Sequence, residues 1–257
     1  MTTRRPGPLL VALVGLTGLL AAVASAAGVL LRGDLATTPF TTLRGDQVDV
    51  LVAGVYRFNG EAIAAEGIGW DLVTLLAAVP ALAVTLIGFG RGSMRATLVV
   101  LGLLVYLLYQ YAEYAMALAY GPLFLLYVAI AGLSASLIGV LVARLNRDVL
   151  AAVVAGPRFP RRAVVAFGGF VALLLCGMWL PLVARTATSV SVPELGAGTT
   201  LVVQAFDLAF LVPLGILTAV AAWRRRPAGA VLAPMLAVKG ATMGAAIAAM
   251  LVVEAAV

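Results

Sequence analysis

The sequence predicts an all-α protein, a bundle of seven membrane-spanning helices. Of its 257 residues, 63% are hydrophobic and only 11% are charged, whereas about a quarter of the residues in a soluble domain are charged. Seven apolar runs reach the roughly 20 residues that a helix needs to cross a bilayer. The arginines lie in short clusters between these runs. The lipid bilayer is therefore the expected environment of the chain.

The seven runs form one transmembrane domain over residues 1–257. The spans are predicted at 8–31, 68–90, 96–119, 122–142, 163–184, 201–223 and 228–253. Residues 32–67 form a long outer link, whose middle part (46–58) is apolar enough to lie at the membrane interface or to cover the bundle as a lid. Arg57 and Glu61 would pair if this part were helical, since they stand four residues apart.

The distribution of arginine predicts the orientation of the bundle. Cytoplasmic links of membrane proteins carry an excess of Arg and Lys. The basic clusters are Arg4, Arg5, Arg91, Arg95, Arg144, Arg147, Arg158, Arg161, Arg162 and Arg224 to Arg226. All of them fall on one side if the N-terminus is inside and the C-terminus outside, as in a multi-pass protein of the plasma membrane. The net charge of +6 then reflects orientation and does not indicate binding to nucleic acid.

The first apolar run also has features of a cleavable signal peptide. Arg4 and Arg5 precede it, and Ala24-Ser25-Ala26 resembles a cleavage site. However, its apolar core is longer than the roughly 7–15 residues that are usual in a signal. An uncleaved first span is therefore the favoured interpretation.

The second and sixth spans begin alike, which suggests an internal repeat. WDL at 70–72 leads to Pro80, and FDL at 206–208 leads to Pro213. Spans one to three would then correspond to spans five to seven, with span four as a connector. Two parallel repeats in this 3+1+3 order occur in the SWEET sugar transporters, although their orientation is opposite to the one predicted here.

Several classes of site are excluded by composition. The chain has no histidine and a single cysteine, Cys176. His-ligated haem, the usual zinc sites, Ser-His triads and an intrachain disulfide are therefore ruled out. We expect no metal and no cofactor, and Cys176 is interpreted as a small packing residue.

Four ionisable residues fall inside the predicted spans and are candidates for a functional site. Asp71, Glu113 and Asp207 are expected in the outer third of the bilayer, with the only lysine, Lys239, about 20 Å from the outer end of its helix. A structural salt bridge between Asp207 and Lys239, on consecutive antiparallel helices, is one interpretation. Asp71 would suit headgroup water at the start of its helix, where its charge favours the helix dipole.

The third span carries a polar stripe. Its sequence, YLLYQYAEYAMALAY, places Tyr106, Tyr109, Gln110, Glu113 and Tyr120 on roughly one helical face. An interfacial aromatic belt accounts for Tyr114 and Tyr120. The deeper members of the stripe form either a wet wall of a pocket or ordinary interhelical hydrogen bonds.

The run YLLYQYAEYAMALAYGPLFLLYVAIAGLSASL, with WDLVTLLAAVPAL before it and FDLAFLVPL and LAVKG after it, resembles a family of multi-pass membrane proteins from actinobacteria and other bacteria. That family has no assigned activity. The resemblance covers spans two to seven and implies a multi-helix membrane fold. Members of the family usually have a small or uncharged residue at the position of Glu113. The resemblance therefore favours Asp71, Asp207 and Lys239 over Glu113 as essential residues of the site.

Four functional hypotheses follow. The first is binding or transport of a small ligand in an outward-facing polar pocket, with Asp207 and Lys239 as a gate or coupling pair. The second is a membrane enzyme that uses carboxylate acid–base chemistry on a lipophilic substrate. The third, suggested by the lone lysine of the seventh span, is a retinal protein. The fourth is an accessory subunit that stabilises a membrane partner and has no site of its own.

Overall fold

The computed structural model describes residues 5–254 and confirms the all-α prediction. Seven helical stretches within that range are long and apolar enough to cross a membrane. The spans are α1 (Pro8–Leu30), α2 to α3 (Glu61–Gly90), α4 (Met94–Ala117), α5 (Phe124–Ala143), α7 (Arg161–Thr186), α8 to α9 (Val202–Trp223) and α10 (Gly229–Glu254). A short helix, α6 (Arg147–Ala155), joins α5 to α7.

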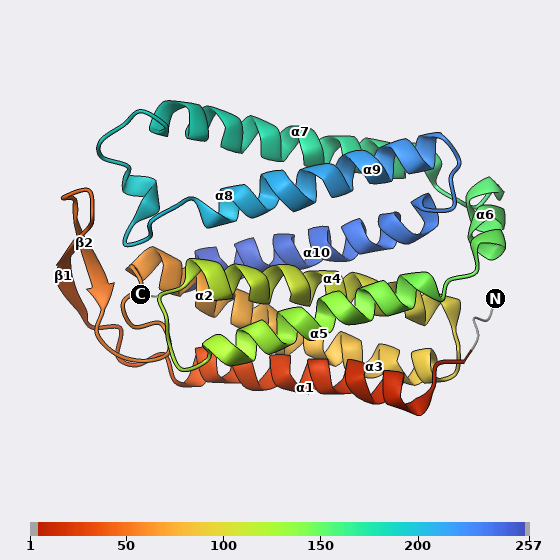
Figure 1. Ribbon diagram of the computed structural model, residues 1–257, viewed down its shortest axis with the longest axis horizontal. Coiled ribbons are helices and arrows are strands. Elements are labelled where there is room, and N and C mark those ends of the chain that lie inside the picture. Colours follow the sequence, from red (N-terminus) through yellow and green to blue (C-terminus); the bar gives the residue numbers. More distant parts are fainter. Residues whose placement is uncertain (1–4, 255–257) are drawn as a thin grey trace.

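The two ends of the bundle differ in their connections (Figure 1), and the sequence shows that they also differ in charge. The hairpin end carries strands β1 (Thr37–Thr41) and β2 (Gln47–Leu51) and a short 3-10 helix (Pro193–Leu195). The arginine end carries the α3–α4 and α9–α10 turns, α6, and every arginine predicted to be cytoplasmic from Arg91 to Arg226. Arg4 lies outside the described residues. The hairpin end also has four arginines, Arg32, Arg44, Arg57 and Arg185, so arginine is enriched at the other end but not confined to it. Such an enrichment is the pattern expected of a cytoplasmic face.

The long link, expected as an interfacial segment or a lid, contains a β-hairpin. β1 and β2 pair antiparallel with Thr37 opposite Leu51 and Thr41 opposite Gln47. Gly45, at φ +87°, allows the turn between the strands. The guanidinium of Arg57 lies 5.1 Å from the ring centroid of Phe58, and the next helix begins only at Glu61. Arg57 therefore does not lie in the same helix as Glu61, and a shared helix was the condition for the predicted pair.

The second and sixth spans both contain a π-helical turn. It covers Thr74–Ala78 between α2 (Glu61–Val73) and α3 (Val79–Gly90), and Asp207–Leu211 between α8 (Val202–Phe206) and α9 (Val212–Trp223). A proline follows each turn, at Pro80 and Pro213. Because proline lacks an N–H and its ring collides with the carbonyl four residues earlier, it disturbs the regular α-helical hydrogen bonds before it, although α7 and α10 continue through Pro181 and Pro234. The wider π turn accommodates this mismatch.

These turns support the internal repeat and correct its register. Each span has a five-residue π turn followed by a twelve-residue α-helix. Aligning the turns pairs Thr74 with Asp207 and Pro80 with Pro213, whereas the sequence alignment paired Asp71 with Asp207. The contacts follow the same symmetry, since α2 packs on α10 and α8 packs on α4.

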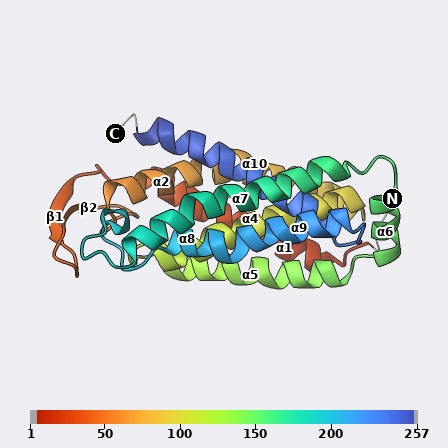
Figure 2. The ribbon, with the colours of Figure 1, turned by 90° about the horizontal axis from the view of Figure 1, so that it is seen from above.

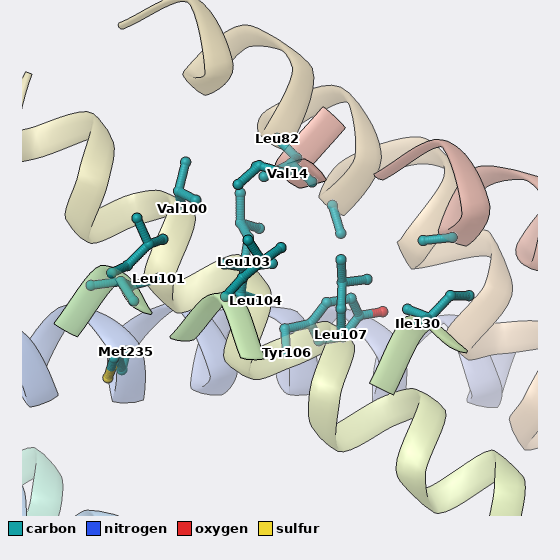
Figure 3. Close-up of a cluster of buried hydrophobic side chains, with 14 of the residues drawn as sticks. Val14, Leu82, Val100, Leu101, Leu103, Leu104, Tyr106, Leu107, Ile130 and Met235 are labelled. Atoms are coloured by element: carbon teal, nitrogen blue, oxygen red, sulfur yellow. The ribbon is translucent and has the colours of Figure 1, made fainter. Parts of the chain in front are cut away.

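The core of the bundle is centred on α4. Two thirds of its apolar window (67%) is buried, compared with 17% for α7. Figure 3 shows Leu101, Leu104 and Leu107 of α4 among side chains from other helices, including Val14 of α1 and Leu82 of α3. α7 packs chiefly on α9 and lies on the outside of the bundle (Figure 1). Polar residues on α4 therefore point into the best-shielded part of the molecule.

Candidate functional site

The polar stripe of the third span faces the interior of the bundle. Tyr106, Tyr109, Gln110 and Glu113 are all buried on α4, which agrees with the predicted common face. The helix ends at Ala117, however, so the fifth predicted member, Tyr120, lies beyond it and is 79% exposed. Around the four buried residues the fold assembles Lys239 of α10, Asp207 of the second π turn, Trp70 of α2 and Trp179 of α7.

Asp207 is buried and satisfied by two aromatic donors. The hydroxyl of Tyr109 donates to its Oδ1 at 2.6 Å, and the indole Nε1 of Trp179 donates to Oδ2 at 2.8 Å. The side chain is 0% exposed. Hydrogen bonds to an ionised acceptor are stronger than those between neutral groups, so the two donors from α4 and α7 hold the carboxylate in place.

Lys239 lies in a box of aromatic rings. Its Nζ is 3.6 Å from the ring centroid of Tyr109, 4.5 Å from that of Trp70 and 5.8 Å from that of Tyr106. The residue is 1% exposed, and its Nζ has no hydrogen-bond partner within the described part of the chain. A desolvated cation–π contact contributes about 2 kcal/mol, which offsets only part of the cost of burying an ammonium group.

The predicted Asp207–Lys239 salt bridge is wrong. No ion pair joins these two side chains, and the salt bridge found among the described side chains (residues 5–253) is between Arg185 and Glu194, at 2.5 Å. The physical reason is Tyr109, which gives its hydroxyl to Asp207 and its ring face to Lys239. The carboxylate and the ammonium group are therefore linked through one tyrosine instead of touching.

Glu113 and Gln110 complete the cluster. Glu113 is 8% exposed and lies within electrostatic reach of Lys239, Asp207 and Glu66. Both polar atoms of the Gln110 side-chain amide are buried without a partner among the described residues. Buried polar groups of this kind ordinarily bind protein atoms or ordered water. Lys239 and Gln110 thus have buried polar atoms that could form hydrogen bonds to a polar ligand.

Asp71 forms a separate buried site and does not lie in headgroup water. Its helix begins at Glu61, seven residues earlier than predicted, which places Asp71 about 15 Å along the helix. The hydroxyl of Tyr56 donates to its Oδ2, and that of Tyr114 donates to the carbonyl of Gly67 at 2.7 Å. Burial, with the neighbouring Asp71 charge, raises the pKa of Tyr56 above its usual value. The belt interpretation fails for Tyr114, which is buried, and fits only Tyr120.

A cavity at the hairpin end shares one residue, Trp179, with the cluster. Its volume is about 340 Å³, and it lies between α2, the end of α4 and the segment 194–204. Glu66, Gln204 and Trp179 are among its lining residues, and no Lys or Arg of the described chain lines it. Glu194 lies at the same cavity and is the residue paired with Arg185. Trp179 thus contacts the cavity and also holds Asp207.

Tyr56, Trp70 and Trp179 are contributors that the sequence analysis did not single out. Trp70 precedes Asp71 in a motif that was noted only for its aspartate, and the fold turns its ring toward Lys239. Tyr56 lies in the link that was expected at the interface. Among the side chains of residues 5–253, which the structure describes, no group of three or more His, Cys, Asp or Glu could hold a metal ion. Cys176 is a half-buried free thiol that packs beside Leu175 and Leu211.

The fold and the site together define a class: an integral, multi-pass membrane protein with a charged, aromatic-lined cluster in its core. The chain matches no family model, and no curated protein or solved structure matches it. The similarity to the bacterial multi-pass family described above therefore stays a prediction. Function has to be inferred from the geometry of the site.

Proposed function

We propose that the protein binds a small cationic or polar solute at the hairpin end and transports it across the plasma membrane. The observation that carries the proposal is Trp179. This residue lines the cavity at the hairpin end, and its indole N–H donates a hydrogen bond to Asp207 in the cluster. A solute in the cavity is thus one side chain away from buried charge in the membrane.

The charge balance favours a cation. Glu66 lines the cavity, and Glu113 and Asp207 belong to the buried cluster that Trp179 links to it. The single opposing charge in the cluster is Lys239. An ammonium group that entered would meet the same aromatic faces that Lys239 now occupies, and cation–π attraction is strongest for such desolvated sites.

The π turn of the sixth span offers a means of breaking the contact between Trp179 and Asp207. Asp207 begins a π turn, and Pro213 follows in the next helix. Discontinuous helices that meet near the bilayer midplane are typical of substrate sites in transporters. A change in the π turn would move Asp207 away from Trp179 and Tyr109, and it would free the path past Lys239.

Lys239 takes the role of a resident counter-charge in this scheme. It balances Asp207 and Glu113 in the absence of solute, yet it forms no direct bond that an incoming cation would have to break.

Proteoliposomes test the proposal. The full chain is reconstituted and the uptake of three labelled probes is followed: choline as a cation, mannitol as a neutral solute and sulfate as an anion. We expect saturable choline uptake above that of protein-free liposomes, with little mannitol or sulfate uptake. Lys239→Met should lower choline uptake at least tenfold, since it removes, at nearly constant volume, the resident counter-charge that replaces the cation at Asp207 and Glu113 when the solute leaves.

The matched control is Arg158→Met, which removes an exposed cation at the arginine end and should leave uptake unchanged. Uptake of all three probes at the level of protein-free liposomes would contradict transport of this solute class. Equal uptake by Lys239→Met and the wild type would contradict the role given to the lysine.

A further inference from the structure

A second cavity opens at the arginine end, far from the charged cluster. Its volume is about 460 Å³, and it lies between the end of α5, the helix α6 and the start of α10. Figures 1 and 2 both show α6 at this end of the molecule, beyond the ends of the spans. A cavity of this size is within the range of ligand-binding sites, roughly 300 to 1,000 Å³.

The wall of this cavity combines an apolar surface with two cations. Val142 of α5, Leu150 of α6 and Leu232 of α10 contribute to the apolar part. Arg147 and Arg226 are the charged residues that line it, and the other described lining residues are apolar. The site therefore offers a hydrophobic floor next to two guanidinium groups.

The backbone fixes both arginines at the cavity. Arg147 is the first residue of α6, and the side chain of Asn146 caps that helix by accepting from the backbone N–H of Asp148 at 2.9 Å. Arg226 closes the end of α9, where its N–H donates to the carbonyl of Ala221 at 2.9 Å. The two residues come from separate elements and line the same cavity, so both positive charges lie on its wall.

The position of this cavity in the membrane indicates which class of ligand it would bind. The arginine end is the predicted cytoplasmic face, where headgroups of anionic lipids lie. Arginine binds phosphate oxygens with paired, charge-assisted hydrogen bonds. An apolar floor beside the cations suits the acyl chains of the same molecule and would be of no use to a free phosphate ion.

We propose that this cavity is a binding site for an anionic phospholipid, with the phosphodiester held between Arg147 and Arg226 and the acyl chains on α5 and α10. Bound lipid would tie α6 to the α9–α10 turn. The site is independent of the solute pathway at the hairpin end.

Native mass spectrometry of the full chain in a neutral detergent tests this site. Phosphatidylglycerol and phosphatidylcholine with identical acyl chains are titrated separately, and the bound fraction is measured. We expect phosphatidylglycerol to bind at least tenfold more tightly than phosphatidylcholine. The double variant Arg147→Gln with Arg226→Gln should lose this preference.

The matched control is Arg158→Gln with Arg225→Gln, which removes two arginines of the same end that do not line the cavity. It should keep most of the preference; a loss equal to that of the cavity variant would show a diffuse basic surface and overturn the proposal. Equal binding of the two lipids by the wild type would also overturn it.

Two further measurements complete the test. One distinguishes a bound lipid from a bound soluble phosphate, and the other distinguishes loss of the site from misfolding of a variant. Inorganic phosphate at millimolar concentration should not displace phosphatidylglycerol; full displacement would assign the arginines to a free anion. Leu232→Trp fills the cavity without changing charge, and it should weaken phosphatidylglycerol binding on its own. Unchanged binding by this variant, confirmed as monodisperse, would contradict the location.

Discussion

At the scale of single residues, Tyr109 explains why the membrane core holds charge without a direct ion pair. Its hydroxyl donates to Asp207 while its ring faces Lys239 at 3.6 Å. Trp179 supplies the second donor to the same carboxylate. Removing either donor leaves one oxygen of a buried carboxylate unsatisfied, which costs more than an average hydrogen bond contributes.

Trp179→Phe should therefore destabilise the protein by about 1–2 kcal/mol, because the ring is largely retained and the bond to Asp207 is lost. Trp223→Phe is the matched control, since Trp223 is 73% exposed, and it should change stability by less than about 0.5 kcal/mol. Unfolding in mixed micelles with increasing dodecyl sulfate measures both. Equal effects of the two substitutions would show that the indole bond is not important for stability.

Gly28 of α1 is a second residue whose role depends on close approach. A Cβ at this position would lie 1.6 Å from Oδ2 of Asp71. Gly28→Ala should destabilise the fold by about 2 kcal/mol or more, as overpacking in a core does. At Gly132 of α5 a Cβ meets nothing within 4 Å, so Gly132→Ala should be neutral or stabilising. The same unfolding assay compares them, and a neutral Gly28→Ala would contradict the packing around Asp71.

At the scale of elements, the helix ends and π turns set where the site residues point. The π turn widens the helix before Pro213 and directs Asp207 toward α4 and α7. The corresponding Thr74 in the other π turn lies 2.5 Å from the hydroxyl of Tyr106. The two halves of the bundle thus place a polar side chain at the same point of each turn, and only one of the two carries charge.

The α9–α10 turn contains an arginine in a conformation that favours glycine. Arg225 has φ +53°, and a non-glycine residue in the left-handed region costs about 1–2 kcal/mol. Arg225→Gly should raise stability by about 1 kcal/mol. Arg224→Gly is the control, because Arg224 has φ −80° and gains nothing from glycine. Chemical unfolding of both variants checks this, and equal or reversed effects would contradict the turn geometry.

At the scale of the whole molecule, the separation of an arginine end from a hairpin end predicts how the protein sits in the membrane. Because the chain has one cysteine, Cys176→Ser provides a cysteine-free background. Thr199→Cys at the hairpin end should react with a membrane-impermeant maleimide on intact cells, and Arg158→Cys should react only after lysis. Labelling of Arg158→Cys on intact cells would reverse the predicted orientation.

Much of the fold could be predicted from the sequence, but the surroundings of the site residues could be predicted only in part. The apolar runs located all seven spans. The common face predicted for Tyr106, Tyr109, Gln110 and Glu113 is buried on α4, whereas its fifth member, Tyr120, is exposed. The hairpin was missed, although Thr- and Val-rich segments around a Gly-Asp turn are typical of one. Because Tyr56 reaches Asp71 only through that folded link, the burial of Asp71 was missed as well.

The sequence by itself determined the seven spans, the enrichment of arginine at one end and the presence of Asp71, Glu113, Asp207 and Lys239 inside the bilayer, because these follow from the free energy of burying apolar and charged side chains in lipid. Only the tertiary structure decided what those groups contact. Asp207 receives its donors from residues 98 and 28 positions away, and such contacts depend on the rotation and packing of whole helices. A depth estimate along a helix cannot distinguish a salt bridge from two charges separated by an aromatic ring.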